Sequence, residues 1–578
     1  MILITGANGQ LGYDFQRLFD EIKEEYIATD VNDLDIIDIE KVREFVKDKD
    51  ISLIINCAAY NNVDKAEDEP ELCRKLNTYA PRDLAIIANE IGADYITYST
   101  DFVFDGKKKT PYTEEDIPNP LSVYGKTKLE GEKEVFRVKP NSFVVRTSWV
   151  FGIANNNFNK QVINWSKSKD ELSIVDDQIS SPTYSKDLAY YSWELIKTKK
   201  YGLYHLSNDG EASKYDQAKY VLDKINWQGK LNRAKTKDFN LKAERAEYTK
   251  LNSEKLEKII NMKIPSWENG IDRFLEEKIY KKIKDMIFSS NIFKEIYAVF
   301  IAGSIGRKEK KIIDKNLNDV DFYVVAKKMI KDKKELEEKL NLFFKTRFTD
   351  ISFISLKQYR RIYSKTYLEQ IFYDINRGAV YLYESLKFKK MRENNQSRKY
   401  KILKRSAYIV YCTRLWCLVG PYDFDEKNGI YIKDEQFAIY QIKKAISAII
   451  DASLILCDSY NKIDKMSKIK SLKVTKYYIE NIEYYKKLLE FYFKKNKKIN
   501  LQIYSEILNM YLKFGEIILK DKILFFELIK EKPYLILKKN NFLKIINYIR
   551  RYHHLKKIYK ILLKNKNDYR LKKYLYKF

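Results

Sequence analysis

The sequence predicts an α/β protein that begins with a doubly wound parallel sheet and continues into further domains. Two observations carry this prediction. A short apolar strand over residues 1–5 leads directly into Gly6-Ala7-Asn8-Gly9-Gln10-Leu11-Gly12, and a helical pattern follows. Apolar strands then alternate with helical stretches, which is typical of a parallel sheet covered by helices on both faces. The length of 578 residues is that of several domains.

The first strand–helix junction has the glycine spacing of a Rossmann-type dinucleotide-binding loop. Gly6 permits a tight turn, Gly9 lets a pyrophosphate approach the backbone, and Gly12 lets the helix pack against the strand. The helix N-terminus then faces the phosphates. The alternative is a purely structural turn. The residues expected to bind NADH or NADPH here are Gly6, Asn8, Gly9, Gln10, Leu11 and Gly12.

Two later strand ends complete the predicted cofactor site. The strand over residues 26–29 ends at Asp30, whose carboxylate suits ribose hydroxyls and disfavours a 2′-phosphate. The strand over residues 52–56 leads into Ala58, Ala59 and Tyr60, where small residues let a cofactor lie close. Both strand ends are expected at the carboxyl edge of the sheet, where ligands of such folds bind.

A hydroxyl, a phenol and an ammonium follow at a spacing that suits proton transfer. The strand over residues 95–100 delivers Thr100 to the same edge, and Tyr124 and Lys128 lie four residues apart on a predicted helix. An ammonium close to a phenol favours the phenolate and is expected to lower the pKa of Tyr124. We expect Tyr124 to act as acid, Lys128 to support it and Thr100 to orient a substrate carbonyl.

A second pattern begins after a lysine-rich helix over residues 276–289. The apolar strand over residues 298–302 ends in Gly303-Ser304-Ile305-Gly306-Arg307, and a later strand carries Asp319 and Asp321. Residues two apart on a strand face one side, so the two carboxylates suit Mg²⁺. A further strand carries Asp350 as a third candidate ligand. The alternative is a folded α/β unit in which these acids are merely solvated.

The region beyond residue 395 is expected to be helical. It is nearly free of Gly and Pro, and its clearest amphipathic face consists of Ile439, Ile442, Ile446, Ile449 and Ser453. A substrate-side domain and a docking module both fit this pattern.

Charge and composition narrow the classes of function. Residues 1–278 carry about −7 and the remainder about +35, which together give the total of +28. A basic half fits nucleic acid, but its lysines are dispersed among apolar positions, which favours compositional drift. The chain opens on a strand, no apolar run has membrane-spanning length, and the five cysteines lack metal-ligand spacing. These features predict a cytoplasmic protein without a membrane span.

Residues 1–278 resemble the dTDP-4-dehydrorhamnose reductases, a family of extended short-chain dehydrogenases. The stretches that carry the resemblance are Gly6–Gly12, Leu34–Ile36, Asn56–Tyr60, Val63–Glu67, Ser99–Gly106, Tyr124–Glu130, Arg146–Gly152, Asp176–Gln178, Ser181–Thr183, Leu203–Leu206 and Ile264–Glu268. The resemblance implies that NAD(P)H reduces the 4-keto group of dTDP-4-dehydro-L-rhamnose, a step in making surface polysaccharide precursors. It also allows a homodimer. A nucleotide-binding sensor without turnover is the competing hypothesis.

The same resemblance assigns residues to the substrate and the cofactor. It places adenine near Asp35 and Ile36, and the catalytic roles at Thr100, Tyr124 and Lys128. The residues that it places at the nucleotide sugar are Asp101, Val103, Phe104, Trp149 and Arg245. Two positions depart from the family pattern, because Ala246 stands where a proline is usual and Lys214 stands where a tryptophan is usual. Both departures bear on the identity of the sugar.

Residues 295–385 resemble the DNA polymerase β-type nucleotidyltransferases, although the Gly-Ser to Asp-x-Asp gap is longer than usual. The resemblance implies that Gly303, Ser304 and Arg307 hold a nucleoside triphosphate and that Asp319, Asp321 and Asp350 bind Mg²⁺. The sequence therefore predicts three parts: a reductase-like domain over residues 1–278, a nucleotidyltransferase-like domain over 279–395 and a helical region over 396–578.

Overall fold

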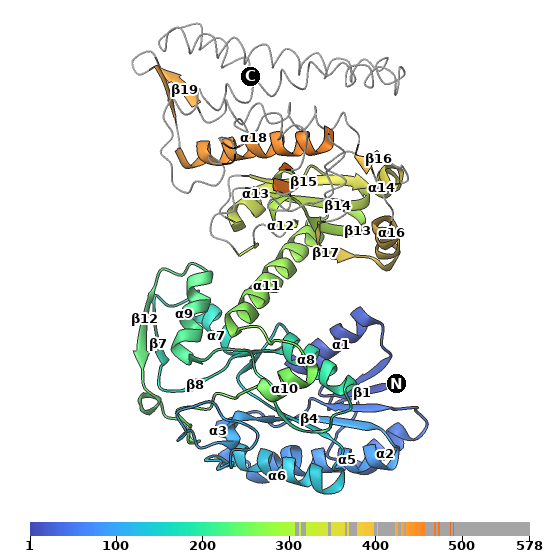
Figure 1. Cartoon of the computed structure of the whole chain (residues 1–578), viewed down its shortest axis with the longest axis vertical. Coiled ribbons are helices and arrows are strands. Elements are labelled where there is room, and N and C mark those ends of the chain that lie inside the picture. The colour runs from blue at the N-terminus through green and yellow to red at the C-terminus, as the bar shows by residue number, and fades with distance from the viewer. Residues whose placement is uncertain are drawn as a thin grey trace. The chain divides into compact units, whose positions relative to one another are not determined.

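The computed structural model divides into two compact units (Figure 1). Unit 1 consists of residues 1–282 and 312–316, and unit 2 of residues 283–311 and 317–578. The boundary between the units falls inside helix α11 (Trp267–Ser289), close to the expected domain boundary at residue 278. The residues that the structure describes are 1–306, 311–313, 319–344, 348–363, 367–368, 378–397, 401–402, 422–425, 429–432, 435–456, 468–469, 472–473, 486 and 489.

Unit 1 is built on a six-stranded parallel sheet, as the sequence predicts. Its strands are β1 (Ile2–Thr5), β2 (Tyr26–Thr29), β3 (Leu53–Asn56), β4 (Asp94–Thr100), β5 (Phe143–Thr147) and β10 (Gly202–His205), in the order β10-β5-β4-β3-β1-β2. The order reverses at β1, which pairs with β2 on one side and β3 on the other. Such a reversal opens a crevice at the carboxyl ends of the strands, where ligands of doubly wound folds bind.

Helices cover both faces of this sheet because its strands are apolar on both sides. Ile2 and Ile4 pack on the face of α1 (Gln10–Ile22), α8 (Ser185–Lys197) and α10 (Glu254–Ile260), whereas Leu3 packs on the opposite face. That opposite face is covered by α2 (Ile39–Lys47), α5 (Ala80–Glu90) and α6 (Val123–Val138) (Figure 1). Three short elements connect β3 to α5: α3 (Val63–Asp68), α4 (Pro70–Arg74) and a π-helix (Lys75–Tyr79).

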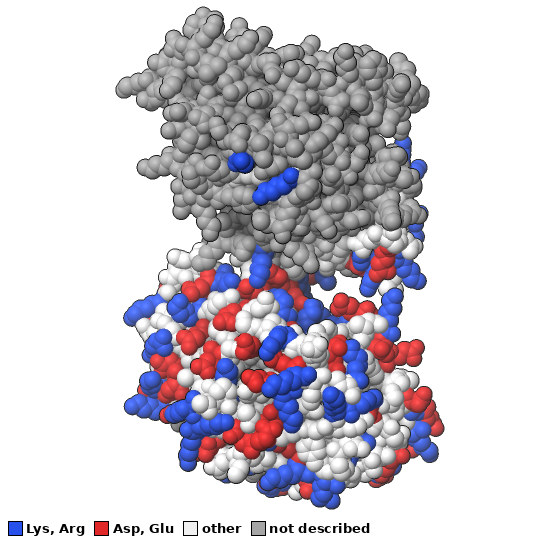
Figure 2. All heavy atoms as spheres, viewed as in Figure 1, with Lys and Arg blue, Asp and Glu red and all other residues white. Residues whose placement is uncertain are grey.

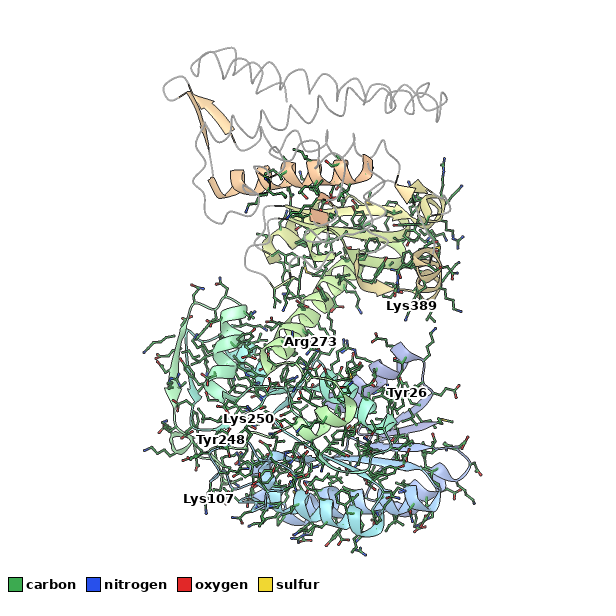
Figure 3. All side chains as sticks on the ribbon, viewed as in Figure 1. Tyr26, Lys107, Tyr248, Lys250, Arg273 and Lys389 are labelled. Atoms are coloured by element: carbon green, nitrogen blue, oxygen red, sulfur yellow. The ribbon has the colours of Figure 1, made fainter. Side chains whose placement is uncertain are left out.

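A smaller subdomain of unit 1 packs around Phe151, Tyr184, Trp267 and Phe274. Its helices are α7 (Phe158–Trp165), α9 (Lys214–Lys224) and the start of α11, and its strands are β6 (Val150–Phe151), β7 (Glu171–Val175), β8 (Ile179–Ser180), β9 (Thr183–Tyr184), β11 (Ala212–Ser213) and β12 (Lys230–Ala234). Arg273, labelled in Figure 3, ties α11 to α8 through two hydrogen bonds of 2.6 Å to the Asp187 carboxylate.

Unit 2 contains a mixed sheet in the order β15-β14-β13-β17. Its strands are β13 (Phe293–Ile301), β14 (Asp319–Met329), β15 (Phe348–Ser355) and β17 (Val380–Glu384). β14 and β15 are parallel, whereas β13 is antiparallel to both β14 and β17. The described helices near these strands in sequence are α12 (Gly303–Gly306), α13 (Lys334–Phe344), α14 (Leu356–Tyr363) and α16 (Leu386–Gln396).

The prediction of a helical chain beyond residue 395 is right for α18 (Glu435–Leu456) and wrong for three strands. Ile446, Ile449 and Ser453 are buried on α18 as expected, whereas the side chains of Ile439 and Ile442 lie outside the described residues. The strands are β18 (Lys401–Ile402), which pairs with β16 (Tyr367–Leu368), and the antiparallel pair β19 (Tyr422–Asp425) and β20 (Gly429–Ile432).

Basic and acidic side chains are interspersed on the face of unit 1 that Figure 2 shows. Many are paired across short distances, for example Arg43 with Glu40 and Glu90. Within the described ranges, none of the helices combines the length and the apolar character that crossing a bilayer requires.

Candidate functional site

The glycine loop forms the predicted close junction between β1 and α1. The Gly9 amide donates to Gly6 O at 3.0 Å, and the Ala7 amide donates to Thr29 O at 3.0 Å, so the loop is tied to the end of β2. The Asn8 amide donates to the Asp30 carboxylate at 2.8 Å. The predicted phosphate loop and the predicted ribose-binding acid therefore lie directly beside each other.

Gly12 has no room for a side chain. A Cβ built there lies 2.4 Å from Gly6 O and 2.8 Å from Ala7 Cα, whereas a Cβ on Gly9 meets only Gly6 O at 3.1 Å. We expect Gly12→Ala to lower the free energy of unfolding by about 1–3 kcal/mol, as overpacking does, and Gly9→Ala to weaken cofactor binding with little loss of stability. Denaturant unfolding and cofactor titration of both variants measure this. Equal stability of the Gly12→Ala variant and the wild type would contradict it.

The end of β3 is held by the side chain of Asn56. Its amide oxygen accepts from Thr5 Oγ1 at 2.8 Å and from the Ala58 amide at 3.2 Å, and its Nδ2 donates to Thr97 Oγ1 at 3.1 Å. Because Asn56 is buried, it connects β1, β3 and β4 at one edge. Ala58 and Ala59 follow at that edge, and the amide of Tyr60 donates to Asn77 Oδ1. Asp35 accepts from the Ile37 amide, and Ile36 is buried.

A segment from the middle of unit 1, residues 153–160, lies against the glycine loop, and sequence reasoning missed this contact. Gln10 Nε2 donates to Asn155 O at 2.7 Å, and Asn155 Nδ2 donates to Asn8 O at 2.8 Å. The Lys160 ammonium holds the same segment through Ile153 O and Ala154 O. These residues are about 145 positions apart in sequence, so no local pattern indicates the contact.

The structure brings Thr100, Tyr124 and Lys128 to one place. Thr100 ends β4, and Ser122 caps α6 by accepting from the Gly125 amide at 3.2 Å, which places Tyr124 in the first turn. The side chain of Thr100 is close enough to the Tyr124 hydroxyl to act on its pKa. The Lys128 ammonium donates to Tyr98 O at 3.0 Å, on the strand that carries Thr100. A hydroxyl, a phenol and an ammonium thus surround the carboxyl end of β4.

The expected direction of the Tyr124 pKa is wrong in this structure. Burial raises the pKa of the Tyr124 phenol, and the nearby Thr100 side chain offsets only part of this rise. Burial also lowers the pKa of Lys128 to about 8, against the smaller effects of Cys73 and Glu132. The reason is that both side chains are desolvated and the ammonium points to the Tyr98 carbonyl oxygen. The phenol therefore keeps its proton near neutral pH, which suits a proton donor.

Asp101 holds Thr100 rather than facing outward. Its fully buried carboxylate accepts from Thr100 Oγ1 at 3.1 Å, from Ser180 Oγ at 2.9 Å and from Thr249 Oγ1 at 2.6 Å. Val103 and Phe104 are also buried, in a cluster with Tyr112. The expectation that Val103 and Phe104 meet the sugar stays a prediction, because both residues are buried beneath the site.

Trp149 and Arg245, two further residues expected at the sugar, each take part in a cation–π contact. Trp149 has a φ of 46°, a left-handed conformation that costs a non-glycine residue about 1–3 kcal/mol and concentrates at functional sites. The Lys214 ammonium lies 3.4 Å from the centre of the Trp149 ring. Arg245 pairs with Asp64 at 2.8 Å and lies 5.7 Å from the ring centre of Phe102, which itself packs edge-on against Tyr124.

His205, the last residue of β10, is a structural residue. It is fully buried, its Nδ1 lies 3.0 Å from Tyr112 O, and its Nε2 lies 3.4 Å from an Arg146 nitrogen. Burial and the neighbouring Arg146 guanidinium lower the pKa of His205 to about 3. It is therefore neutral near pH 7 and takes no part in proton transfer there.

In unit 2, Gly303 and Asp321 are close neighbours. Gly303 has a φ of 64°, and a Cβ built there lies 2.7 Å from Asp321 Oδ2. Asp321 and Asp350 are aligned in the parallel pairing of β14 and β15, but the Asp350 carboxylate accepts from Lys333 at 3.0 Å and Ser352 at 3.1 Å. Among the side chains that the structure describes, no three metal-ligating residues cluster. The side chains of Ser304 and Asp319, and Arg307 as a whole, lie outside the described residues.

The first half of the chain is similar to known proteins. A family model described as the RmlD substrate binding domain matches residues 1–279. The dTDP-4-dehydrorhamnose reductase of Salmonella typhimurium is 37% identical over 291 residues, which cover 48% of this chain and 97% of that protein. The spore coat polysaccharide biosynthesis protein SpsK of Bacillus subtilis is 32% identical over 277 residues, covering 48% and 97%. The solved dTDP-4-dehydrorhamnose reductase of Bacillus anthracis in complex with NADP is 37% identical, covers 48% of this chain and 98% of its own, and has a TM-score of 0.47.

Proposed function

The chain belongs, through its first half, to the dTDP-4-dehydrorhamnose reductase family, and we propose that it reduces the 4-keto group of dTDP-4-dehydro-L-rhamnose or a close analogue with NADPH or NADH. The observation that carries the proposal is the meeting of Thr100, Tyr124 and Lys128 at the carboxyl end of β4, on the sheet edge that also carries the glycine loop. A role in making surface polysaccharide precursors fits the similarity to SpsK.

The residues present fit a dinucleotide. The backbone of Gly6–Gly12 leaves no space for side chains at Gly12, and the start of α1 offers amides toward a pyrophosphate. Asp30 lies beside the loop, where its carboxylate can accept from ribose hydroxyls. Ala58 and Ala59 leave the neighbouring strand end uncrowded. A bound reduced nicotinamide supplies the hydride.

The chain's own residues then handle the carbonyl and its proton. The hydride adds to C4 of the sugar, the C=O π bond breaks, and the oxygen takes the proton of the Tyr124 hydroxyl to give the alcohol. The Thr100 hydroxyl donates to Asp101 in this structure, so it must rotate to donate to the carbonyl oxygen. Lys128 stabilises the phenolate that remains on Tyr124, because its ammonium is anchored at Tyr98 O, two residues before Thr100 on β4.

The direct test follows nicotinamide absorbance in the presence of the keto-sugar. Oxidation of NADH or NADPH that depends on dTDP-4-dehydro-L-rhamnose supports the proposal. Tight cofactor binding without oxidation by any 4-keto sugar nucleotide would instead favour a nucleotide sensor.

We expect both cofactors to be used, with kcat/KM values within a factor of about one hundred, which is roughly 2.7 kcal/mol. Asp30 repels a 2′-phosphate, but its carboxylate is partly neutralised by the amides of Asn8 and Val31. Asp30→Asn should therefore shift the ratio of the two kcat/KM values toward NADPH by about tenfold. Steady-state kinetics with each cofactor measure the ratio. A shift toward NADH would contradict the assignment of Asp30 to the ribose.

For unit 2 we propose a second activity, the transfer of a nucleoside monophosphate from a triphosphate to a small acceptor. The specific observation is the contact of Gly303 with the Asp321 carboxylate at the junction of β13, α12 and β14. Carboxylate oxygens at this position suit Mg²⁺, and Asp319 and Asp321 would hold it. The acceptor oxygen would bond to the α-phosphorus while the bond to pyrophosphate breaks, so that pyrophosphate leaves. Mg²⁺ would offset charge at that phosphorus.

A further inference from the structure

Lys214 is the first residue of α9 and lies inside the proposed sugar end of unit 1. Its ammonium is 3.4 Å from the ring centre of Trp149 and 4.8 Å from that of Phe158. Asp101, the buried carboxylate next to Thr100, is close enough to act on its charge. Lys214 therefore lies between the residue expected at the sugar and the residue that holds the carbonyl-orienting hydroxyl.

None of the residues that the structure describes accepts a hydrogen bond from the Lys214 ammonium or forms an ion pair with it. The ammonium lies instead against the faces of the Trp149 and Phe158 rings. The Asp101 oxygens already accept from Thr100, Ser180 and Thr249. The nearest acid on the same helix, Asp216, is engaged by the backbone and hydroxyl of Ser213 in the helix cap.

The position is also electrostatically unfavourable for a cation. A helix N-terminus carries partial positive charge, which favours anions and disfavours an ammonium. Burial lowers the pKa of Lys214 to about 7, against the smaller raising effect of Asp101. Stacking on Trp149 and Phe158 offsets only part of this cost. An anion that binds the Lys214 ammonium would explain why a lysine occupies this position.

We propose that Lys214 is an anion-binding residue at the sugar end of the substrate site, where it pairs with a phosphate or a carboxylate of the bound nucleotide sugar. The inference rests on the proposed reductase function for the identity of the ligand class. The Lys214 ammonium supplies the charge and the N–H donors that such an anion needs. The two sources of the anion are the sugar-proximal phosphate and an acidic group on the sugar ring.

Equilibrium binding of three unreactive probes tests this. The probes are dTDP, dTDP-glucose and dTDP-glucuronic acid, titrated by calorimetry into the wild type, Lys214→Met, Lys214→Arg and the control Lys219→Met. Lys219 is an exposed residue of the same helix that pairs with Asp223. We expect Lys214→Met to bind about 10- to 100-fold more weakly, the size of a lost charge-assisted hydrogen bond, and Lys214→Arg and Lys219→Met to stay within a few-fold of wild type.

The three probes distinguish the source of the anion. An equal loss with all three assigns Lys214 to the phosphate, and a loss only with dTDP-glucuronic acid assigns it to a sugar carboxylate. Equal affinities of Lys214→Met and Lys219→Met for every probe, or no binding of any probe to the wild type, would overturn the inference. Binding that depends on Lys214 without any hydride transfer would overturn the proposed reaction alone.

Stability offers a second readout that a merely structural lysine would not give. Below about pH 7 Lys214 is charged in both the folded and the unfolded chain, and burying this charge lowers the free energy of unfolding. The destabilisation decreases as pH rises toward 10.5, the ordinary pKa of lysine. Lys214→Met should therefore melt at a higher temperature than Lys219→Met at pH 6, with the difference shrinking at pH 9. A lower melting temperature of Lys214→Met than of Lys219→Met at pH 6 would show that Lys214 stabilises the fold, and it would contradict a role in anion binding.

Discussion

Replacing Tyr124 by phenylalanine should lower kcat for keto-sugar reduction by about 10²–10⁴, the usual contribution of a positioned general acid. The substitution removes one oxygen and leaves the ring to pack edge-on against Phe102. Cofactor affinity should change little, because the substitution leaves the glycine loop and Asp30 unaltered. Single-turnover kinetics with saturating cofactor separate the chemical step from binding.

Tyr190→Phe is the matched control, since Tyr190 is an exposed residue of α8 outside the site. It should retain wild-type kcat. A Tyr124→Phe variant that stays folded and reduces the keto-sugar at the wild-type rate would remove Tyr124 from the mechanism. The proton would then come from another donor.

The sequence could predict the sheet of unit 1 because local signals agree with the tertiary structure there. The apolar strand before Gly6 and the helix that begins at Gln10 appear as expected, and Thr100 ends a strand at the same sheet edge. The i, i+4 spacing of Tyr124 and Lys128 likewise identifies one helix face. Periodicity and glycine spacing are local properties, so they survive without knowledge of the fold.

The electrostatics of the site could not be predicted in the same way. The pKa of Tyr124 depends on how deeply the ring is buried and on where the Lys128 ammonium points, and neither is encoded by their spacing. Asp101 illustrates the same limit, because its partners Ser180 and Thr249 are 79 and 148 positions away. Long-range contacts of this kind appear only when the chain is folded.

The β19–β20 hairpin could have been predicted from the sequence. The antiparallel pair β19 and β20 was expected to be helical, yet only three residues separate two short stretches rich in aromatic and branched residues, Tyr422–Asp425 and Gly429–Ile432. Two such stretches at this separation, with a glycine at the junction, are a hairpin signal. The low content of Gly and Pro over the wider region concealed this signal.

Asp319→Asn combined with Asp321→Asn should abolish pyrophosphate release by unit 2 and leave keto-sugar reduction by unit 1 unchanged. Each substitution removes a negative charge while keeping the size of the side chain. The loss should be at least about 10²–10³, the effect of removing one preorganised charge-stabilising group. Pyrophosphate release is measured with the four ribonucleoside triphosphates, their deoxy forms and a panel of small acceptors in the presence of Mg²⁺.

Glu335→Gln is the control within unit 2, because Glu335 is an exposed residue of α13 whose partner is Lys339. Neither activity should respond to it. The contact between Gly303 and Asp321 predicts that Asp321→Asn alone already causes most of the loss, since its carboxylate is the one that lies against the glycine turn. Asp350→Asn should have a smaller effect, because the Asp350 carboxylate already accepts hydrogen bonds from Lys333 and Ser352.

If the double variant stays folded but loses keto-sugar reduction as well, the two activities are coupled. If the wild type releases no pyrophosphate under any of these conditions, unit 2 is not a nucleotidyltransferase, and the acids beside Gly303 are a structural feature of its sheet.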